Sequence, residues 1–231
     1  MNPTLLKLLR GCDTPTICNA IEVAQGKRGF DAFTRGTMIA SAPAEPPMVG
    51  YAVTAQLRAR APSMAPPEAV RAQRMAYYRA MYEASKPSIA VVEDLDFPDC
   101  IGAYWGEVNT TIHKAFGLSG ALTNGVVRDL GDLPEGFPVV AGSIGPSHGF
   151  VHVVSVGDPV TIFGLRIATG DLVHADRHGV VVIPPEVVPD LEAAIGKLRG
   201  SEYVILAPMR AGLESFGEFE EAWRRFEASR V

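Results

Sequence analysis

The sequence predicts an α/β fold, a single domain of mixed β-sheets flanked by helices. The apolar run SIAVVEDL at residues 88–95 is typical of a buried strand with parallel neighbours. A helical pattern over residues 105–117 separates it from a second strand at 119–125, and this order implies a parallel pair with a right-handed crossover. After residue 150, closely spaced strands broken by Gly and Asp indicate a further β-rich layer.

Capping signals predict two short helices near the N-terminus. Asn2 precedes Pro3, and Thr14 precedes Pro15, so each pair places a capping side chain before a proline at the first helical position. Gly26 provides the stop for the second helix.

Periodicity predicts the remaining elements. Residues 49–57 are rich in small and β-branched residues and predict a strand, and 137–143 predict another. Apolar positions near a helical period predict a helix over 66–85. Helices over 185–200 and 214–229 should follow the β-rich layer.

Composition supports one globular domain and argues against nucleic acid as a partner. Of 231 residues, 47% are hydrophobic and 20% are charged, which is ample for a core. We expect one domain over residues 1–231, with N-terminal helices (about 2–26) and C-terminal helices (about 184–230) as appendages.

The net charge of −5 is unlike that of most nucleic-acid binders. Three unpatterned cysteines, expected to be core residues, indicate neither a disulfide framework nor a zinc site: Cys12, Cys18 and Cys100.

Residues 136–157 lack Asp, Glu, Lys and Arg and are long enough to span a bilayer. They also contain two prolines, five glycines and two histidines, so buried strands joined by turns are the better interpretation. The start MNPTLLKLLRGCDTP is too short and interrupted for a signal peptide. We therefore expect a soluble, cytoplasmic protein with no membrane partner.

Two stretches should face each other across one cleft. In a strand–helix–strand unit, the helix begins at the carboxyl end of the first strand, and the loop after the second strand leaves at the same edge. Here Gly106–Asn109 opens the helix, and Arg128 and Asp129 follow the second strand. The helix start offers unpaired N–H groups, and Arg128 offers a planar fork for a carboxylate. These features predict a carboxylate pocket, although such an Arg-Asp pair is also typical of a turn with a solvated ion pair.

Asp129 suggests a metal beside that pocket. A single carboxylate suits Mg²⁺, which keeps several waters and takes one or two protein carboxylates. Asp132 could hold those waters, and Glu107 could do the same or move a proton. A cation between Asp129 and an anionic substrate would act as a Lewis acid on a carbonyl oxygen.

The histidines more often fill structural roles. His148 and His152 lie in the glycine-rich apolar segment, where a hydrogen-bonded structural histidine is the usual occupant. Alternation could bring His174, Asp176 and His178 together as metal ligands, but a tight Asp-Arg-His-Gly turn is the simpler interpretation.

Other motifs of known chemistry are weak or missing. GSIGPSHG lacks the lysine and spacing of a P-loop. No nucleophile elbow with Ser-His-acid order occurs, and no glycine-rich strand-to-helix loop with a ribose-binding acid supports a methyltransferase.

The central segment resembles one known family. WGEVNTTIHKAFGLSGALTNGVVRDLGDL is similar to the segment of the family that joins 4-hydroxy-4-methyl-2-oxoglutarate aldolase to the regulator of ribonuclease E activity A. In that pattern an acid, here Glu107, is followed by twenty residues, then by Arg128-Asp129 and the further acid Asp132. TPTICNAI, GYAVTAQ and ATGDLVHADRHGVVVIP extend the likeness over most of residues 10 to 190.

The resemblance implies a β/β/α swivelling fold, a homotrimer or hexamer with sites near subunit interfaces, and Mg²⁺, Mn²⁺ or another divalent cation. It also implies a lyase that cleaves a 4-hydroxy-2-oxo acid to pyruvate and a keto acid, and that decarboxylates oxaloacetate through the same pyruvate enolate. Arg128 would bind the substrate's carboxylate and enolate oxygen, and Asp129 would hold the metal. The pyruvate-like end would meet backbone N–H groups of four residues: Gly106, Glu107, Val108 and Asn109.

The chain departs from the aldolases of that family at two places. Glu107 stands where they carry Asp, and Val108-Asn109 replaces a more apolar pair. The regulator branch leaves a second hypothesis open, a non-catalytic protein that binds a ribonuclease. Family members also borrow an acid from a neighbouring subunit, for which three residues are candidates: Glu214, Glu218 and Glu220.

Overall fold

The computed structural model describes residues 1–229. The chain forms two compact units, one made of residues 1–14 and 31–184, the other of residues 15–30 and those from 185 onward. All the strands belong to the first unit, and the described part of the second is helical.

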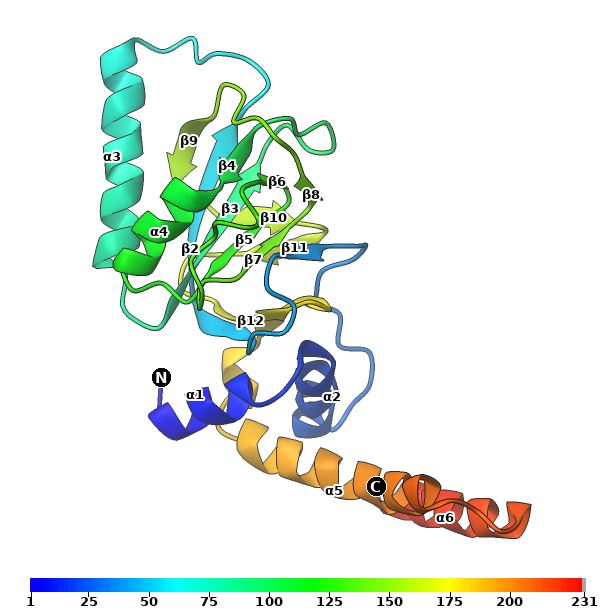
Figure 1. Cartoon of the computed structure of the whole chain (residues 1–231). Coiled ribbons are helices and arrows are strands. Elements are labelled where there is room, and N and C mark those ends of the chain that lie inside the picture. The colour runs from blue at the N-terminus through cyan, green and yellow to red at the C-terminus, as the bar shows by residue number, and fades with distance from the viewer. Residues whose placement is uncertain (230–231) are drawn as a thin grey trace. The chain divides into compact units, whose positions relative to one another are not determined.

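The first unit is built on an eight-stranded mixed sheet in the order β1-β7-β5-β3-β2-β12-β13, with β9 pairing the second half of β2 (Figure 1). The four central strands β7, β5, β3 and β2 run parallel, as predicted for the run at 88–95, and the outer strands pair antiparallel. The strands are β1 Ile39–Ala40, β2 Met48–Arg58, β3 Ser88–Asp94, β5 Ala121–Thr123, β7 Val139–Ala141, β9 His152–Val156, β12 Leu172–Asp176 and β13 Gly179–Ile183.

Two smaller sheets complete the strands. β4 (Ala103–Trp105), β6 (Val126–Val127) and β8 (Ser143–Ile144) pair in parallel, and β10 (Val160–Ile162) and β11 (Leu165–Ile167) form a hairpin. The expected strand at 119–125 therefore ends at residue 123, and the chain enters the second sheet at 126. The segment 136–157 forms strands joined by turns, as predicted, but only β7 of its three strands is buried, whereas β8 and β9 are partly exposed. No helix of residues 1–229 is long and apolar enough to cross a bilayer.

Helices α3 (Pro67–Glu83) and α4 (Glu107–Ala115) lie side by side on one face of the large sheet (Figure 1). Helix α1 (Pro3–Arg10) begins as predicted, because the Asn2 side chain accepts a hydrogen bond from the Thr4 N–H at 2.9 Å. The prediction that Thr14 is the N-cap of the second helix is wrong. Its hydroxyl bonds Nδ1 of His174 at 3.0 Å, and Thr14 is already the first residue of α2 (Thr14–Gln25).

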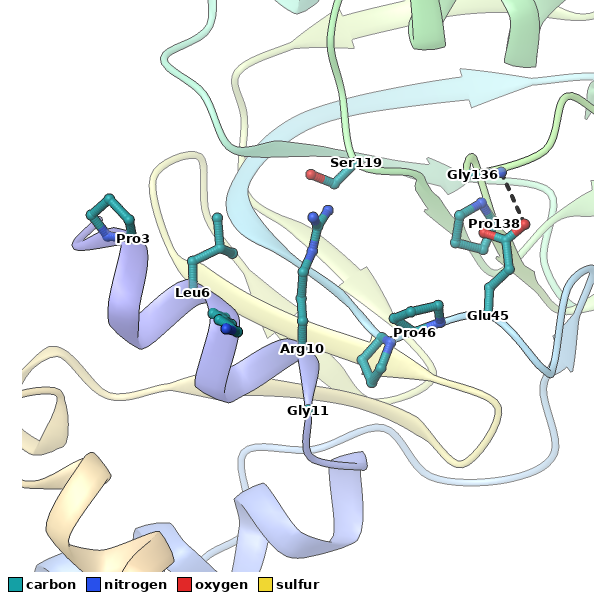
Figure 2. A pocket seen from close by; sticks show the side chains of 11 residues that line it. Pro3, Leu6, Arg10, Gly11, Glu45, Pro46, Ser119, Gly136 and Pro138 are labelled. Carbon is teal, nitrogen blue, oxygen red and sulfur yellow. Dashed lines mark hydrogen bonds between the residues drawn. The ribbon is translucent and has the colours of Figure 1, made fainter.

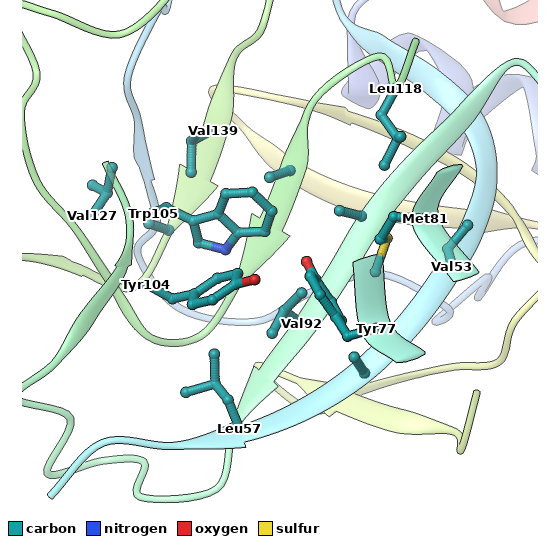
Figure 3. Packing of buried hydrophobic residues seen from close by; sticks show 14 of the residues in the cluster. Val53, Leu57, Tyr77, Met81, Val92, Tyr104, Trp105, Leu118, Val127 and Val139 are labelled. Atoms are coloured by element: carbon teal, nitrogen blue, oxygen red, sulfur yellow. The ribbon is translucent and has the colours of Figure 1, made fainter. Parts of the chain in front are cut away.

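Two apolar clusters fill the first unit, one on each side of the large sheet. The largest buried side chains of the cluster under α3 and α4 are Trp105, Tyr77 and Phe137. Figure 3 shows the first two. The other is closed by the β10–β11 hairpin, whose Ile162 and Ile167 are fully buried. A mixed sheet flanked by helices confirms the predicted fold class.

The second unit contains α2 and the C-terminal helices α5 (Leu191–Ala211) and α6 (Phe216–Ser229), preceded by a 3₁₀ turn at Pro185–Val187. Helix α5 thus starts later and runs further than the predicted 185–200. The three acids proposed to serve a neighbouring copy are exposed here: Glu214, Glu218 and Glu220.

Candidate functional site

The candidate site is built where β4 and β6 end. Trp105 pairs with Val127 in parallel, and the Arg128 N–H donates to the Trp105 carbonyl at 2.8 Å. Helix α4 starts immediately after β4, so the predicted stretches Gly106–Asn109 and Arg128-Asp129 do meet. The strands that bring them together differ from the expected pair, because β3 and β5 lie in the large sheet and β4 and β6 in the small one.

Gly106 is the N-cap of α4 and packs directly against the Arg-Asp pair. A Cβ at this position would lie 2.5 Å from Oδ2 of Asp129 and 2.9 Å from Cγ of Arg128. Its backbone is extended, with φ −153° and ψ −172°, so close approach rather than an unusual dihedral requires glycine here.

Asp129 is held from one side and open on the other. Its Oδ2 accepts the Glu107 N–H at 3.1 Å and lies 3.3 Å from Nε of Arg128. Oδ1 has no hydrogen-bond partner in the described part of the chain, and a third of the side chain is exposed. Asp129 also has a left-handed backbone, φ 53°, which few residues other than Gly, Asn and Asp adopt readily. The Glu107 N–H and Arg128 therefore orient the carboxylate through Oδ2 and leave its other oxygen free to bind.

Arg128 presents an open fork beside it. Nε faces Asp129, whereas Nη1 and Nη2 contact no acceptor within residues 1–229. The side chain is about as exposed as that of Asp129, 32%. Two free guanidinium nitrogens in one plane match a carboxylate or an enolate oxygen.

The first turn of α4 supplies further donors. Its first internal bond runs from the Thr110 N–H to the Gly106 carbonyl at 3.0 Å, so the N–H groups of Val108 and Asn109 have no acceptor within the helix. They add to the positive end of the helix dipole. The side chains of Glu107 and Val108 are exposed.

The donor set suits a hard divalent cation that keeps most of its waters. No group of three or more His, Cys, Asp or Glu residues in the described chain could enclose a metal. The free Oδ1 of Asp129 supplies one carboxylate oxygen, which is the kind and number of ligand that Mg²⁺ accepts. Asp132 is exposed in the same turn, where its N–H donates to the Asp129 carbonyl at 2.9 Å.

Comparison with known proteins identifies the family. The Aldolase/RraA family model matches residues 14–182. The chain belongs to this family.

The proteins that this chain resembles in sequence have different names. A Halalkalibacterium halodurans protein named "Putative 4-hydroxy-4-methyl-2-oxoglutarate aldolase" is 30% identical over 112 residues, 48% of this chain and 52% of that protein. Protein DlpA of Legionella pneumophila is 25% identical over 235 residues, 96% of this chain and 35% of that protein. The chain thus spans about half or less of the length of these two relatives.

Two solved structures share the fold. An uncharacterized protein from Pseudomonas syringae pv. tomato has a TM-score of 0.69 and 21% identity, covering 97% of this chain and 94% of that one. Streptomyces coelicolor RraAS2, described as an unusual member of the RNase ES inhibitor RraA protein family, has a TM-score of 0.66 and 20% identity, covering 89% and 98%. The Aldolase/RraA family therefore includes proteins named as aldolases and proteins named as ribonuclease inhibitors.

Four histidines of this Aldolase/RraA chain make hydrogen bonds within the described residues, in keeping with the structural roles predicted for them. His174 is fully buried, and its Nε2 lies 3.0 Å from the Leu9 carbonyl. Asp176 ends β12 and His178 lies in the tight turn to β13, where Oδ1 of Asp176 accepts the His178 N–H at 2.8 Å. Two others contact backbone carbonyls through Nδ1: His148 and His152. The described chain has no disulfide, and Cys12 is buried as expected, whereas the other two cysteines are half-buried: Cys18 and Cys100.

A hollow of about 570 Å³ lies elsewhere, between α1 and the loops at 45–47 and 136–138 (Figure 2). Arg10 extends toward Ser119 in it, and the Glu45 carboxylate accepts the Gly136 N–H at 2.9 Å. None of the described residues predicted for catalysis lines this hollow.

A buried polar cluster between α3 and α4 is a feature that the sequence did not predict. His113 is completely buried, its Nε2 lies 2.6 Å from the Tyr77 hydroxyl, and its Nδ1 lies 2.6 Å from the Asn109 carbonyl. Because a carbonyl can only accept, Nδ1 carries the proton and Tyr77 donates to Nε2. The available signal was the spacing of Asn109 and His113, four residues apart on one helix face.

His113 should make stability depend on pH. Burial, aided by the Lys86 charge, lowers its pKa to about 4, against the bond to the Asn109 carbonyl. In the unfolded chain this histidine takes up a proton near pH 6.5, whereas in the folded chain it stays neutral until about pH 4. The free energy of unfolding should therefore fall by about 3 kcal/mol as the pH falls from 6.5 toward 4. His113→Gln should flatten this slope in urea denaturation at several pH values. Burial also lowers the pKa of His174, so part of the slope should remain. An identical slope in wild type and variant would contradict the assignment.

Proposed function

We propose that this chain is a divalent-metal-dependent carbon–carbon lyase without a Schiff base. It would cleave a 4-hydroxy-2-oxo acid such as 4-hydroxy-4-methyl-2-oxoglutarate to pyruvate and a keto acid, and decarboxylate oxaloacetate. The observation that carries the proposal is the convergence of three open groups: Oδ1 of Asp129, the terminal nitrogens of Arg128 and the N–H groups of the α4 start.

In this proposal each residue has a distinct task. The α4 N–H groups and Arg128 bind the 2-oxo acid end of the substrate, which places the carbonyl oxygen beside the free oxygen of Asp129. Mg²⁺ or Mn²⁺ bound there would act as a Lewis acid on that oxygen. Arg128 stabilises the negative charge that this oxygen gains, and donors held in place before reaction give the largest stabilisation.

The proton balance requires a base at the other end of the substrate. As the C3–C4 bond breaks, its electron pair forms the enolate, and the 4-hydroxyl loses its proton to give the second keto acid. Glu107, exposed beside the pair, is our candidate to take that proton, directly or through a water. Protonation of the enolate at C3 then yields pyruvate. In oxaloacetate, loss of CO₂ leaves the same enolate and needs no such base.

A ribonuclease-binding regulator is the alternative. It would use a surface, and it would have no need of a glycine that packs against a half-open Arg-Asp pair. Two results together would favour the regulator. The wild type would release no pyruvate, and a pull-down would show that Asp129→Ala still binds the ribonuclease.

The assembly is also a proposal. We expect a homotrimer or a pair of trimers in which an exposed acid of a second copy completes the site. The candidates are the three acids between or on the C-terminal helices: Glu214, Glu218 and Glu220.

Metal removal tests the proposed function. Pyruvate release should be measured with oxaloacetate and a panel of 4-hydroxy-2-oxo acids, with Mg²⁺, with EDTA, and with EDTA followed by excess Mg²⁺. We expect release above an enzyme-free blank that EDTA abolishes and Mg²⁺ restores, because the free Asp129 oxygen alone cannot polarise the substrate. Release unaffected by EDTA would exclude the metal mechanism, and no release from any substrate would exclude the lyase.

A further inference from the structure

Asn109 stands in the first turn of α4, yet its side chain faces away from the site. Its Nδ2 donates to the Tyr104 carbonyl at 2.7 Å, and its Oδ1 accepts the Tyr78 hydroxyl at 2.7 Å. Both ends of the amide are thus committed to protein partners. A substrate at the α4 start would meet the backbone N–H of Asn109, not its side chain.

These contacts join three elements. Tyr78 belongs to α3, Tyr104 to β4 and Asn109 to α4, so one amide ties the start of α4 to the strand before it and to the neighbouring helix. The two polar bonds lie in a partly buried setting, where water competes less for each partner than at an open surface.

His113, one turn further along α4, also holds the first turn of the helix. His113 bonds the Asn109 carbonyl and the Tyr77 hydroxyl, and its ring lies 4.8 Å from Trp105, measured between centroids. The rings of Tyr77 and Tyr104 meet edge to face at 5.6 Å, and Figure 3 shows their hydroxyls pointing toward one another. Tyr77 and Tyr78, adjacent on α3, therefore hydrogen-bond to two successive turns of α4.

We infer that Tyr78 is a positioning residue for the candidate site: through Asn109 it fixes the first turn of α4, whose N–H groups receive the substrate's carboxylate. This inference rests on the proposed function for what is bound there. The physical reason is geometric, because a donor displaced by about 1 Å loses much of its value to a bound anion.

The decisive variant is Tyr78→Phe, which removes one hydroxyl and keeps the ring contacts to Tyr77 and Phe116. Tyr82→Phe is the matched control, because Tyr82 lies one turn further on α3, is 65% exposed and packs against Phe116 without reaching Asn109. Thermal melting should be measured on both variants to check that each is folded.

We expect Tyr78→Phe to raise KM for Mg²⁺-dependent oxaloacetate decarboxylation about fivefold, the effect of one lost hydrogen bond, while kcat stays within about twofold. Substrate and transition state share the carboxylate, so its binding affects KM first. A merely structural role would lower the active fraction and leave KM unchanged. Tyr82→Phe should match the wild type in both constants.

Hydrogen exchange supplies a readout that needs no activity. The amides of residues 110–113 bond the carbonyls of residues 106–109, and they should exchange faster in Tyr78→Phe than in Tyr82→Phe. An active wild type with unchanged KM and exchange in Tyr78→Phe would overturn the inference. If the wild type releases no pyruvate, the proposed function fails, and exchange alone decides whether Tyr78 holds the helix start.

Discussion

Asp129→Asn should lower Mg²⁺-dependent pyruvate release by about a thousandfold or more. The substitution removes the negative charge that we assign to the cation while keeping the shape of the side chain. Loss of a Lewis acid and of the charge that anchors it removes several kcal/mol of transition-state stabilisation. The measurement is kcat/KM for oxaloacetate over a range of Mg²⁺ concentrations, together with Mn²⁺ binding by calorimetry in the presence of oxalate.

Asparagine is a sharper choice than alanine at this position. Asp129 has a φ of 53°, which Asn tolerates and Ala adopts only with strain, so Asp129→Asn changes charge with little change in backbone. Glu135→Gln is the control, because Glu135 is an exposed acid in the loop that follows. Should Asp129→Asn keep its activity and its Mn²⁺ affinity, the cation would bind elsewhere and the assignment of Asp129 would be wrong.

The sequence predicted the main elements around the site but not the small sheet that joins them. The run at 88–95 is apolar on both faces, and this identified β3 and its parallel neighbours correctly. β6 and β8 have two residues each, too few for any periodicity, and Trp105 was assigned to the helix although it ends β4. The correct juxtaposition of Gly106 and Arg128 was thus reached through the wrong pair of strands.

Contacts between side chains far apart in the sequence could not be predicted from it. Tyr78 and Asn109 are 31 residues apart, and the pattern of α3 shows only that its tyrosines lie near an apolar stripe. The left-handed backbone of Asp129 has no sequence signal beyond the tolerance of Asp for that conformation. Such details arise from packing, which fixes side-chain partners only after the elements have docked.

Gly106→Ala should reduce activity by about a hundredfold or more while the protein stays folded. The new Cβ would lie 2.5 Å from Oδ2 of Asp129 and 3.0 Å from Nε of Arg128, closer than atoms in contact allow. Both side chains are about a third exposed and can swing outward, so the clash is relieved by moving the two groups on which the mechanism depends. The extended backbone accommodates alanine, and the weaker N-cap costs about 1 kcal/mol in the free energy of unfolding.

Gly131→Ala is the matched control, since it lies two residues beyond Asp129, is exposed, and has nothing within 4 Å of its added Cβ. Pyruvate release and urea denaturation should be measured on both variants. Gly106→Ala keeps every charge of the site but moves the Arg128 and Asp129 side chains, whereas Asp129→Asn keeps the side-chain shape but removes one charge. The two variants therefore test separately the placement of these groups and the charge of Asp129. Wild-type activity in Gly106→Ala would mean that Arg128 and Asp129 can move without consequence, and chemistry at this helix start would then be excluded.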